Sequence, residues 1–399
     1  MSTVYALPSD SAGRDRIRHG LGESLLVEAS AGTGKTTEMV ARMVNVLRSG
    51  MTTIDQLAAV TFTHKAAGEM KLRLRQELDR ARGDSNGADR QHLEHALQHL
   101  EEASIGTIHA FCAQILRERP VEARVDPAFA EITDYQRDRL YSRAFRSWIQ
   151  SRLQEDSPGV RRALSRLAWS KRGDRSPLDD LRYAAIQLVE WRDFTAPWTR
   201  VPFDRHGAID QIVGHLLAVG PKLNQSFAVV RDLATGIARV DDISRRDYDA
   251  LEAQLVKLHR DLIYNKRKGV EDLMAALTTF KTCADADLAA ELKEELAGFV
   301  DRYEELKRQS GQLDFLDQLL LTRDLIRDNL QVRTYLQQRF SHIFVDEFQD
   351  TDPLQAEIIL LLASDNPQQT DWIKARPVDG KLFIQRVDVE APKPEPVAP

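Results

Sequence analysis

The chain has 399 residues, 42% hydrophobic and 29% charged, a balance typical of a globular protein with a buried core. No apolar run is long enough for a membrane-spanning helix, and the net charge of −6 excludes a globally basic nucleic-acid binder, so any such surface must be local. The length allows two or three domains. The first residues lack the basic and apolar segments of a signal peptide, so we expect a cytoplasmic protein.

The first predicted elements are a strand at Ser24–Val27, a glycine-rich loop at Ala29–Thr36 and an amphipathic helix that stops at Gly50. This is the context that a phosphate-binding loop requires, although Ala29 stands where the pattern usually has glycine. The backbone N–H groups of such a loop surround phosphate at a helix N-terminus. The residues expected to bind a nucleoside triphosphate are Ala29, Ser30, Ala31, Gly32, Thr33, Gly34, Lys35, Thr36 and Thr37.

Two side chains of this loop have expected chemical roles. Lys35 reaches the β- and γ-phosphates as a point charge, which makes it a candidate catalytic residue. Thr36 offers a hydroxyl to Mg²⁺.

Strands and helices then alternate, which predicts a parallel sheet covered by helices, the α/β class. The predicted strand at Leu57–Phe62 precedes a helix from Lys65, and a further strand and helix fall near Ile105–Arg117. The turn-rich stretch Gly83–Ala88 separates two helices.

Strand signals fade over residues 119–309, where long charged helical stretches predict an inserted helical domain. Its tryptophans are expected to pack in the core rather than stack on bases; they are Trp148, Trp169, Trp191 and Trp198. Basic clusters at Arg161–Arg175 and Lys266–Lys268 fit solvated helix faces better than contacts with a DNA duplex.

The α/β pattern returns with an apolar strand at Phe340–Val345 and a helix at Pro353–Ala363, for which Asp352 is a suitable N-cap. A last strand at Lys381–Ile384 ends the globular part. Residues 385–399 are rich in proline and predict an extended tail. The domains expected are thus a first part at 1–118, the insertion at 119–309 and the resumed first domain at 310–384.

Two acids follow the apolar strand. Asp346 ends the strand at the edge where open α/β sheets bind ligands, so it is a candidate Mg²⁺ ligand beside Thr36. Glu347, one residue further on, is the candidate general base that polarises water. Adjacent acids are common on surfaces, and their interpretation depends on the phosphate loop.

Four segments resemble motifs of superfamily 1 DNA helicases of the UvrD/Rep type. F-V-D-E-F-Q-D-T-D-P-L-Q at Phe344–Gln355 looks like motif II. The segment Val60–Leu74 resembles motif Ia, Ile105–Cys112 motif Ib, and Asp314–Leu320 the segment that resumes the first motor domain. The sequences of the phosphate loop, A-G-T-G-K-T, and of motif Ib, G-T-I-H-A-F-C, are most similar to the branch that contains AddA and RecB, the β-subunit of exonuclease V.

The resemblance implies a RecA-like P-loop NTPase fold with an inserted helical domain. It implies ATP and Mg²⁺ as cofactors, single-stranded DNA as partner, and helicase activity of 3′–5′ polarity in DNA repair and recombination. The partners that it implies further include a protein that supplies a second motor domain, or other helicase–nuclease subunits. The residues that match the DNA track are Phe62, Thr63, His64, Thr107, His109 and Phe111.

Bland interpretations stay open for some of these side chains. Phe62 and Phe111 also fit a plain core, and His109 a buried imidazole. The sequence departs from the family at His64, where asparagine is usual, and at Pro8–Gly20, where no adenine-recognising glutamine is evident.

No G-D-x-x-Q segment or second motor domain follows Ile384. This pattern is typical of a truncated, frameshifted or split gene product, so we expect poor activity from the isolated chain. The alternative is a non-catalytic DNA- or partner-binding remnant. Motifs Ia and Ib disfavour a P-loop ATPase unrelated to DNA.

Overall fold

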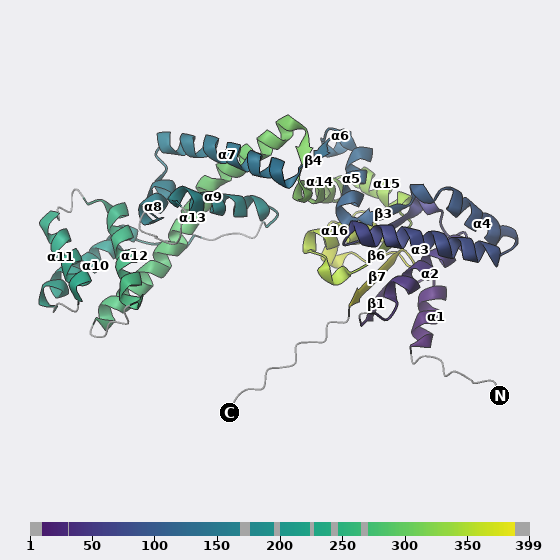
Figure 1. The fold of residues 1–399 in the computed structure, drawn as a ribbon, viewed down its shortest axis with the longest axis horizontal. Coiled ribbons are helices and arrows are strands. Elements are labelled where there is room, and N and C mark those ends of the chain that lie inside the picture. Colours follow the sequence, from purple (N-terminus) through teal and green to yellow (C-terminus); the bar gives the residue numbers. More distant parts are fainter. Residues whose placement is uncertain are drawn as a thin grey trace, which may run out of the picture. The chain divides into compact units, whose positions relative to one another are not determined.

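The computed structural model describes residues 10–30, 32–167, 176–194, 200–223, 227–240, 246–264 and 270–387. The chain forms two compact units, which we call the sheet unit and the helical unit (Figure 1). The sheet unit comprises Met1–Glu131 and Gly311–Pro399, and the helical unit comprises Ile132–Ser310.

The sheet unit is built on a five-stranded sheet in which every neighbouring pair is parallel. In spatial order the strands are β1 (Leu25–Ala29), β7 (Leu382–Val387), β6 (His342–Val345), β2 (Leu57–Thr61) and β3 (Ser104–Thr107). Strand β7 therefore separates the strand before the phosphate loop from the strand before the acidic pair. Because the strands are all parallel, both loops lie at the carboxyl edge of the sheet, where ligands bind in open α/β folds.

Helices cover both faces of this sheet (Figure 1), and successive apolar residues of β2, β6 and β7 belong alternately to the two cores. Phe344 and Phe383 pack in one core, whereas Ile343 and Ile384 pack in the other. The first core is covered by α1 (Ser11–His19), α2 (Lys35–Arg48), α3 (His64–Gly83) and α4 (Gly87–Gln98). The second is covered by α5 (Ile108–Glu118), α6 (Pro120–Ala123), α14 (Phe315–Asp328), α15 (Leu330–Arg339) and α16 (Pro353–Ala363). The predicted α/β class is confirmed.

Helix α16 has the predicted bounds and the predicted cap. The Asp352 side chain accepts a hydrogen bond from the backbone N–H of Gln355, and Pro353 opens the helix. Two short 3₁₀ turns, η6 (Phe348–Asp350) and η7 (Trp372–Lys374), precede and follow this helix. Two others, η1 (Ile54–Gln56) and η2 (Leu100–Glu102), precede β2 and β3.

The helical insertion begins later than predicted. The short strands β4 (Ala130–Glu131) and β5 (Gln312–Leu313) pair in parallel. They lie directly before and after the helical unit in the chain, and both belong to the sheet unit. Ala123 of α6 is buried in the core beneath the sheet. The first part of the sheet unit thus continues beyond residue 118.

The last strand extends beyond its predicted end at Ile384. Strand β7 runs to Val387, so residues 385–387 belong to the sheet and not to the predicted tail. Gln385 is fully buried there. The local pattern carries no sign of this because the polar Gln385 and Arg386 interrupt the apolar run that predicted the strand.

The helical unit consists of two groups of helices that share one long member. Its helices are α7 (Asp134–Gln154), α8 (Pro158–Leu167), α9 (Pro177–Glu190), α10 (Arg205–Val219), α11 (Ala228–Val240), α12 (Tyr248–Tyr264) and α13 (Glu271–Ser310). A 3₁₀ turn, η3 (Gly220–Lys222), follows α10. The first half of α13 packs with α10 to α12, and its second half packs with α7 to α9.

The tryptophans of this unit have different environments. Trp148 is buried and its indole N–H donates to the Glu295 carbonyl, which confirms the core prediction for it. Trp191 is 65% exposed, so the core prediction is wrong there. Trp169 and Trp198 lie outside the described residues.

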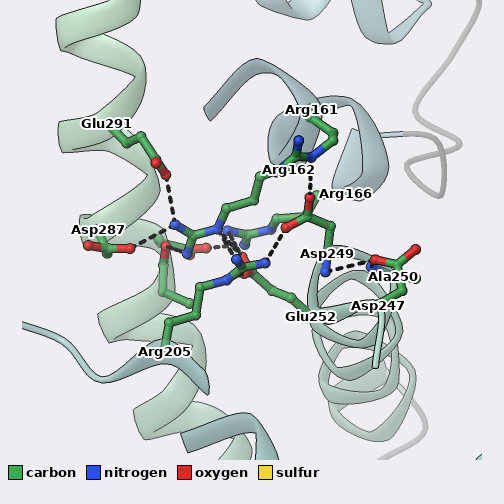
Figure 2. A network of polar contacts seen from close by, with 12 residues as sticks. Arg161, Arg162, Arg166, Arg205, Asp247, Asp249, Ala250, Glu252, Asp287 and Glu291 are labelled. Carbon is green, nitrogen blue, oxygen red and sulfur yellow. Dashed lines mark hydrogen bonds and ion pairs between the residues drawn. The ribbon is translucent and has the colours of Figure 1, made fainter. Parts of the chain in front are cut away.

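A buried ionic cluster joins α8, α12 and α13 (Figure 2). The Arg162 guanidinium donates to Glu252, Asp287 and Glu291, and Arg162 and Glu252 are 2% and 0% exposed. The expectation that the arginines of this stretch form a solvated helix face is therefore wrong for Arg162. Residues 168–175 and Lys266–Lys268 lie outside the described residues. Among the described residues, no helix combines the length and apolarity that crossing a bilayer requires.

The buried His342 at the start of β6 makes the sheet unit sensitive to acid. Burial lowers the pKa of His342 to about 4, and the nearby charges of Arg42 and Lys381 act in the same direction. Because this folded-state pKa lies below the unfolded value, the neutral ring stabilises the fold above about pH 6.5, and that contribution is lost as the pH falls toward 4.

We expect the free energy of unfolding to fall by about 2 kcal/mol more between pH 7 and pH 5 in the wild type than in His342→Gln. Urea denaturation followed by circular dichroism at both pH values measures this difference. An equal pH dependence in the two proteins would contradict it.

Candidate functional site

The predicted phosphate loop joins β1 to α2 and contains two glycines with a left-handed backbone. Gly32 and Gly34 have φ angles of 78° and 87°, in the left-handed region that favours glycine. Gly34 is also the N-cap of α2, so the first N–H groups of that helix are directed toward the loop. The loop residue Ala31 lies outside the described residues.

The side chain of Lys35 is anchored on its own loop. Its ammonium donates to the carbonyls of Ala29 and Ser30, at 2.9 and 3.0 Å. An ammonium has three donors, so a third N–H remains for a phosphate oxygen. The hydroxyl of Thr33 donates to the Ser30 carbonyl and closes the turn. Thr36 is half-buried and Thr37 exposed in the first turn of α2.

Helix α1 fixes this loop through an ionic contact that sequence reasoning missed. Arg14 donates to the Thr33 carbonyl and to Glu38 of α2, both at 2.9 Å, and Arg18 donates to the same carboxylate at 2.6 Å. Burial alone raises the pKa of Glu38, but the hydrogen bonds from Arg18 and Arg14 outweigh it and leave the pKa below its usual value. The spacing of Arg14 and Arg18, four residues apart on one helix face, was the available signal.

A cavity of about 170 Å³ lies between α1, β1 and the phosphate loop. Its lining includes Asp10 and Arg14 from α1 and its cap, Lys35 and Glu38 from α2, and Phe383 from β7. Polar and charged groups therefore border the phosphate loop in the segment where the family glutamine has no counterpart.

Asp346 ends β6 at the same edge of the sheet. Its side chain is buried, and Gln385 of β7 donates to its Oδ1 at 2.5 Å. Burial raises the pKa of Asp346, and this effect outweighs the hydrogen bond from Gln385 and the attraction of Lys35. The charge of Lys35 acts on Asp346 from the phosphate loop and favours its ionised form.

Glu347 has a strained backbone. Its φ and ψ are 54° and 44°, a left-handed conformation that a residue with a side chain rarely adopts. The Gln349 side chain donates to its carboxylate, and η6 begins at the next residue. Strain of this kind is concentrated at functional sites, where the surrounding fold maintains it.

The described residues contain no group of three or more histidine, cysteine, aspartate or glutamate side chains that could hold a metal. A Mg²⁺ site at a nucleotide does not need one, because the ion is bound by one or two protein oxygens, phosphate oxygens and water. Thr36 and Asp346 supply oxygens of this kind. Gln385 Oε1, which is buried without a hydrogen-bond partner among the described residues, is a further acceptor beside Asp346.

The segments that resemble motifs Ia and Ib follow the neighbouring strands β2 and β3 at the carboxyl edge. Thr61 is paired with Thr107, so the residues after them emerge side by side. Phe62 is 62% exposed, and His64 is exposed at the start of α3. The partly buried His109 has a pKa lowered by burial, and His64 is one of the charges that influence it.

Two of the predicted DNA-track side chains are buried and contact other parts of the sheet unit. Phe111 is 3% exposed and packs on Phe340 at 5.0 Å between ring centroids, so its ring is unavailable to a base and that prediction is wrong. The buried Thr107 hydroxyl accepts from the N–H of Ala110 and caps α5. Thr63 caps α3 in the same way but is exposed.

Phe315 is an aromatic residue that sequence reasoning missed. It is 50% exposed in the first turn of α14, and its ring lies 4.9 Å from that of His109. An apolar residue directly after the N-cap Asp314 was the only local signal. The exposed or half-exposed rings at this edge are thus Phe62, His64, His109 and Phe315.

Comparison with known proteins finds relatives over almost the whole chain. The A subunit of the ATP-dependent helicase/nuclease of Levilactobacillus brevis is 27% identical over 97% of this chain and 36% of its own length. The proteins of the same name from Alkaliphilus metalliredigens and Listeria monocytogenes are 25% and 27% identical, each over 92% of this chain. The chain spans about a third of the length of these relatives. The model of the UvrD/REP helicase N-terminal domain matches residues 10–373, and the chain therefore belongs to this family.

Proposed function

We propose that the chain is the ATP-binding half of a UvrD-like DNA helicase that binds Mg·ATP and single-stranded DNA, with 3′–5′ polarity. The observation that carries the proposal is the parallel pairing of β1, β7 and β6, because the phosphate loop after β1 and the acids after β6 therefore lie at the same edge of the sheet. The relatives, which are named as subunits of an ATP-dependent helicase/nuclease, support ATP use and helicase activity. The role that we propose for this activity is in DNA repair and recombination. A protein with a second motor domain and other helicase–nuclease subunits are the partners that fit.

Each nucleotide-site residue then has a defined role. The loop N–H groups at Gly32–Lys35 bind phosphate oxygens, and Lys35 contacts the β- and γ-phosphates. Thr36 and Asp346 hold Mg²⁺, which neutralises charge on the phosphates when it is bound. Glu347 accepts a proton from the attacking water, and its strained backbone fixes where the carboxylate lies.

The DNA side of the proposal uses the aromatic edge. Phe62, His109 and Phe315 offer ring faces on which bases of any sequence can stack. Thr63 and His64 offer backbone and side-chain donors to phosphate. Thr107 and Phe111 support this edge from within, as a helix cap and a core residue.

The nucleotide proposal is tested by replacing Lys35 with alanine. The loss of a charge-assisted hydrogen bond to phosphate is expected to weaken binding of a fluorescent ATP analogue with Mg²⁺ by at least about tenfold. Lys374→Ala, which removes an exposed lysine paired with Asp371, is the matched control and should bind like the wild type. Equal affinity of Lys35→Ala and the wild type would favour a non-catalytic DNA- or partner-binding protein.

A further inference from the structure

Gln385 has a polar amide side chain at a buried position of the sheet, where an amide needs hydrogen-bond partners. It lies on β7 between the two functional strands, paired with Val27 of β1 and one residue beyond the pair of Ile384 with Val345 of β6. Its exposed fraction is 0%. A central, fully covered strand normally has apolar side chains, so a glutamine here requires a specific reason.

One half of its amide has a clear partner. Nε2 donates to Oδ1 of Asp346 at 2.5 Å. The opposite orientation of the amide would place two acceptors against each other, so the carboxylate itself fixes which end of Gln385 faces it. This bond restrains the side chain of the proposed Mg²⁺ ligand.

The other half has no partner. Oε1 is buried and accepts no hydrogen bond from the described residues. A buried carbonyl without a donor is unfavourable, and such groups are usually satisfied by bound water. Mg²⁺ retains several of its waters in nucleotide sites, and the neighbours of metal ligands often bind them.

We propose that Gln385 is a positioning residue for the magnesium site: its amide N–H holds Asp346 in place, and its Oε1 accepts a hydrogen bond from the hydration shell of the ion. This inference rests on the proposed function. It adds a residue from β7 to a site otherwise formed by the loops after β1 and β6.

The test is Gln385→Met, which keeps the length of the side chain and removes both polar atoms. Affinity for the fluorescent ATP analogue is measured as a function of Mg²⁺ concentration and again in EDTA. We expect the variant to need about tenfold more Mg²⁺ than the wild type for half-maximal stimulation of analogue binding, while its affinity in EDTA is unchanged. Gln385→Asn has a side chain one methylene too short to reach Asp346 and should give the same shift. This variant replaces Gln385→Met in the experiment if the methionine variant does not fold.

Gln318→Met is the matched control, because Gln318 of α14 is also 0% exposed and its amide has no hydrogen-bond partner in the described part of the chain. It should keep the wild-type Mg²⁺ dependence. An unchanged Mg²⁺ dependence in Gln385→Met would overturn the proposal, and so would an equal loss with and without Mg²⁺, since a residue acting through Asp346 must act only when the ion is present. If Lys35→Ala still weakens analogue binding, either of these results overturns only the role of Gln385 and not the proposed nucleotide site.

Discussion

Arg162→Ala is expected to lower the free energy of unfolding of the helical unit by about 3 to 5 kcal/mol. The guanidinium donates to Glu252 at 2.8 Å, to Asp287 at 2.7 Å and to the Ala284 carbonyl at 3.0 Å. Its removal leaves these buried acceptors short of a donor and opens a gap between α8, α12 and α13 (Figure 2). Glu252 still accepts hydrogen bonds from Arg166 and Arg205, and Asp287 from Arg200, but each carboxylate loses its most buried donor in an interior that solvates charge poorly.

The preceding residue provides the control. Arg161 also pairs with Asp249, but 59% of its side chain is exposed, so Arg161→Ala should cost no more than about 1 kcal/mol. Urea denaturation of the full chain, followed by tryptophan fluorescence, measures both variants. Equal stability of the two would show that the buried cluster contributes no more than a surface ion pair.

The double variant Phe62→Ala, His109→Ala is expected to weaken binding of single-stranded DNA by about 2 to 6 kcal/mol, at least about 30-fold. Each ring provides a stacking surface for one base, and neither reads base identity. Binding of labelled oligonucleotides should therefore be insensitive to sequence and should weaken steeply as salt is raised. Fluorescence anisotropy at fixed ionic strength measures the change.

Ile373→Ala is the control for this experiment, since Ile373 is an apolar residue of the sheet unit that is 78% exposed in η7, between α16 and β7. It should bind DNA like the wild type. An affinity unaffected by the double variant, or binding confined to duplex DNA, would remove the DNA-track assignment.

Features that depend on neighbouring residues could be predicted from the sequence. The two glycines of the phosphate loop, the N-cap of α16 and the apolar strand before Asp346 are each specified within a few residues. Their order along the chain also predicted a parallel sheet. The family and its α/β class followed from these local patterns.

Burial and cross-strand contacts depended on the tertiary structure. Phe111 and His109 are two residues apart on one helix, yet α5 turns the first into the core and leaves the second near Phe315. Likewise, Arg161 and Arg162 are adjacent and identical residues, but only Arg162 is buried between α12 and α13, whereas Arg161 pairs with Asp249 of α12 from an exposed position. Helical periodicity gives the face on which a residue lies, and only the packed neighbours determine which face is covered.

Local sequence patterns therefore predicted the loop after β1, the acids after β6 and the family. The position of β7 between β1 and β6, which brings Gln385 to Asp346 across 39 residues of chain, could be known only from the folded sheet. Loop geometry and helix caps arise from bonds within a few residues, so a short stretch of sequence specifies them. The order of strands and the pairing of buried polar groups arise from the packing of the whole sheet and its two helical layers.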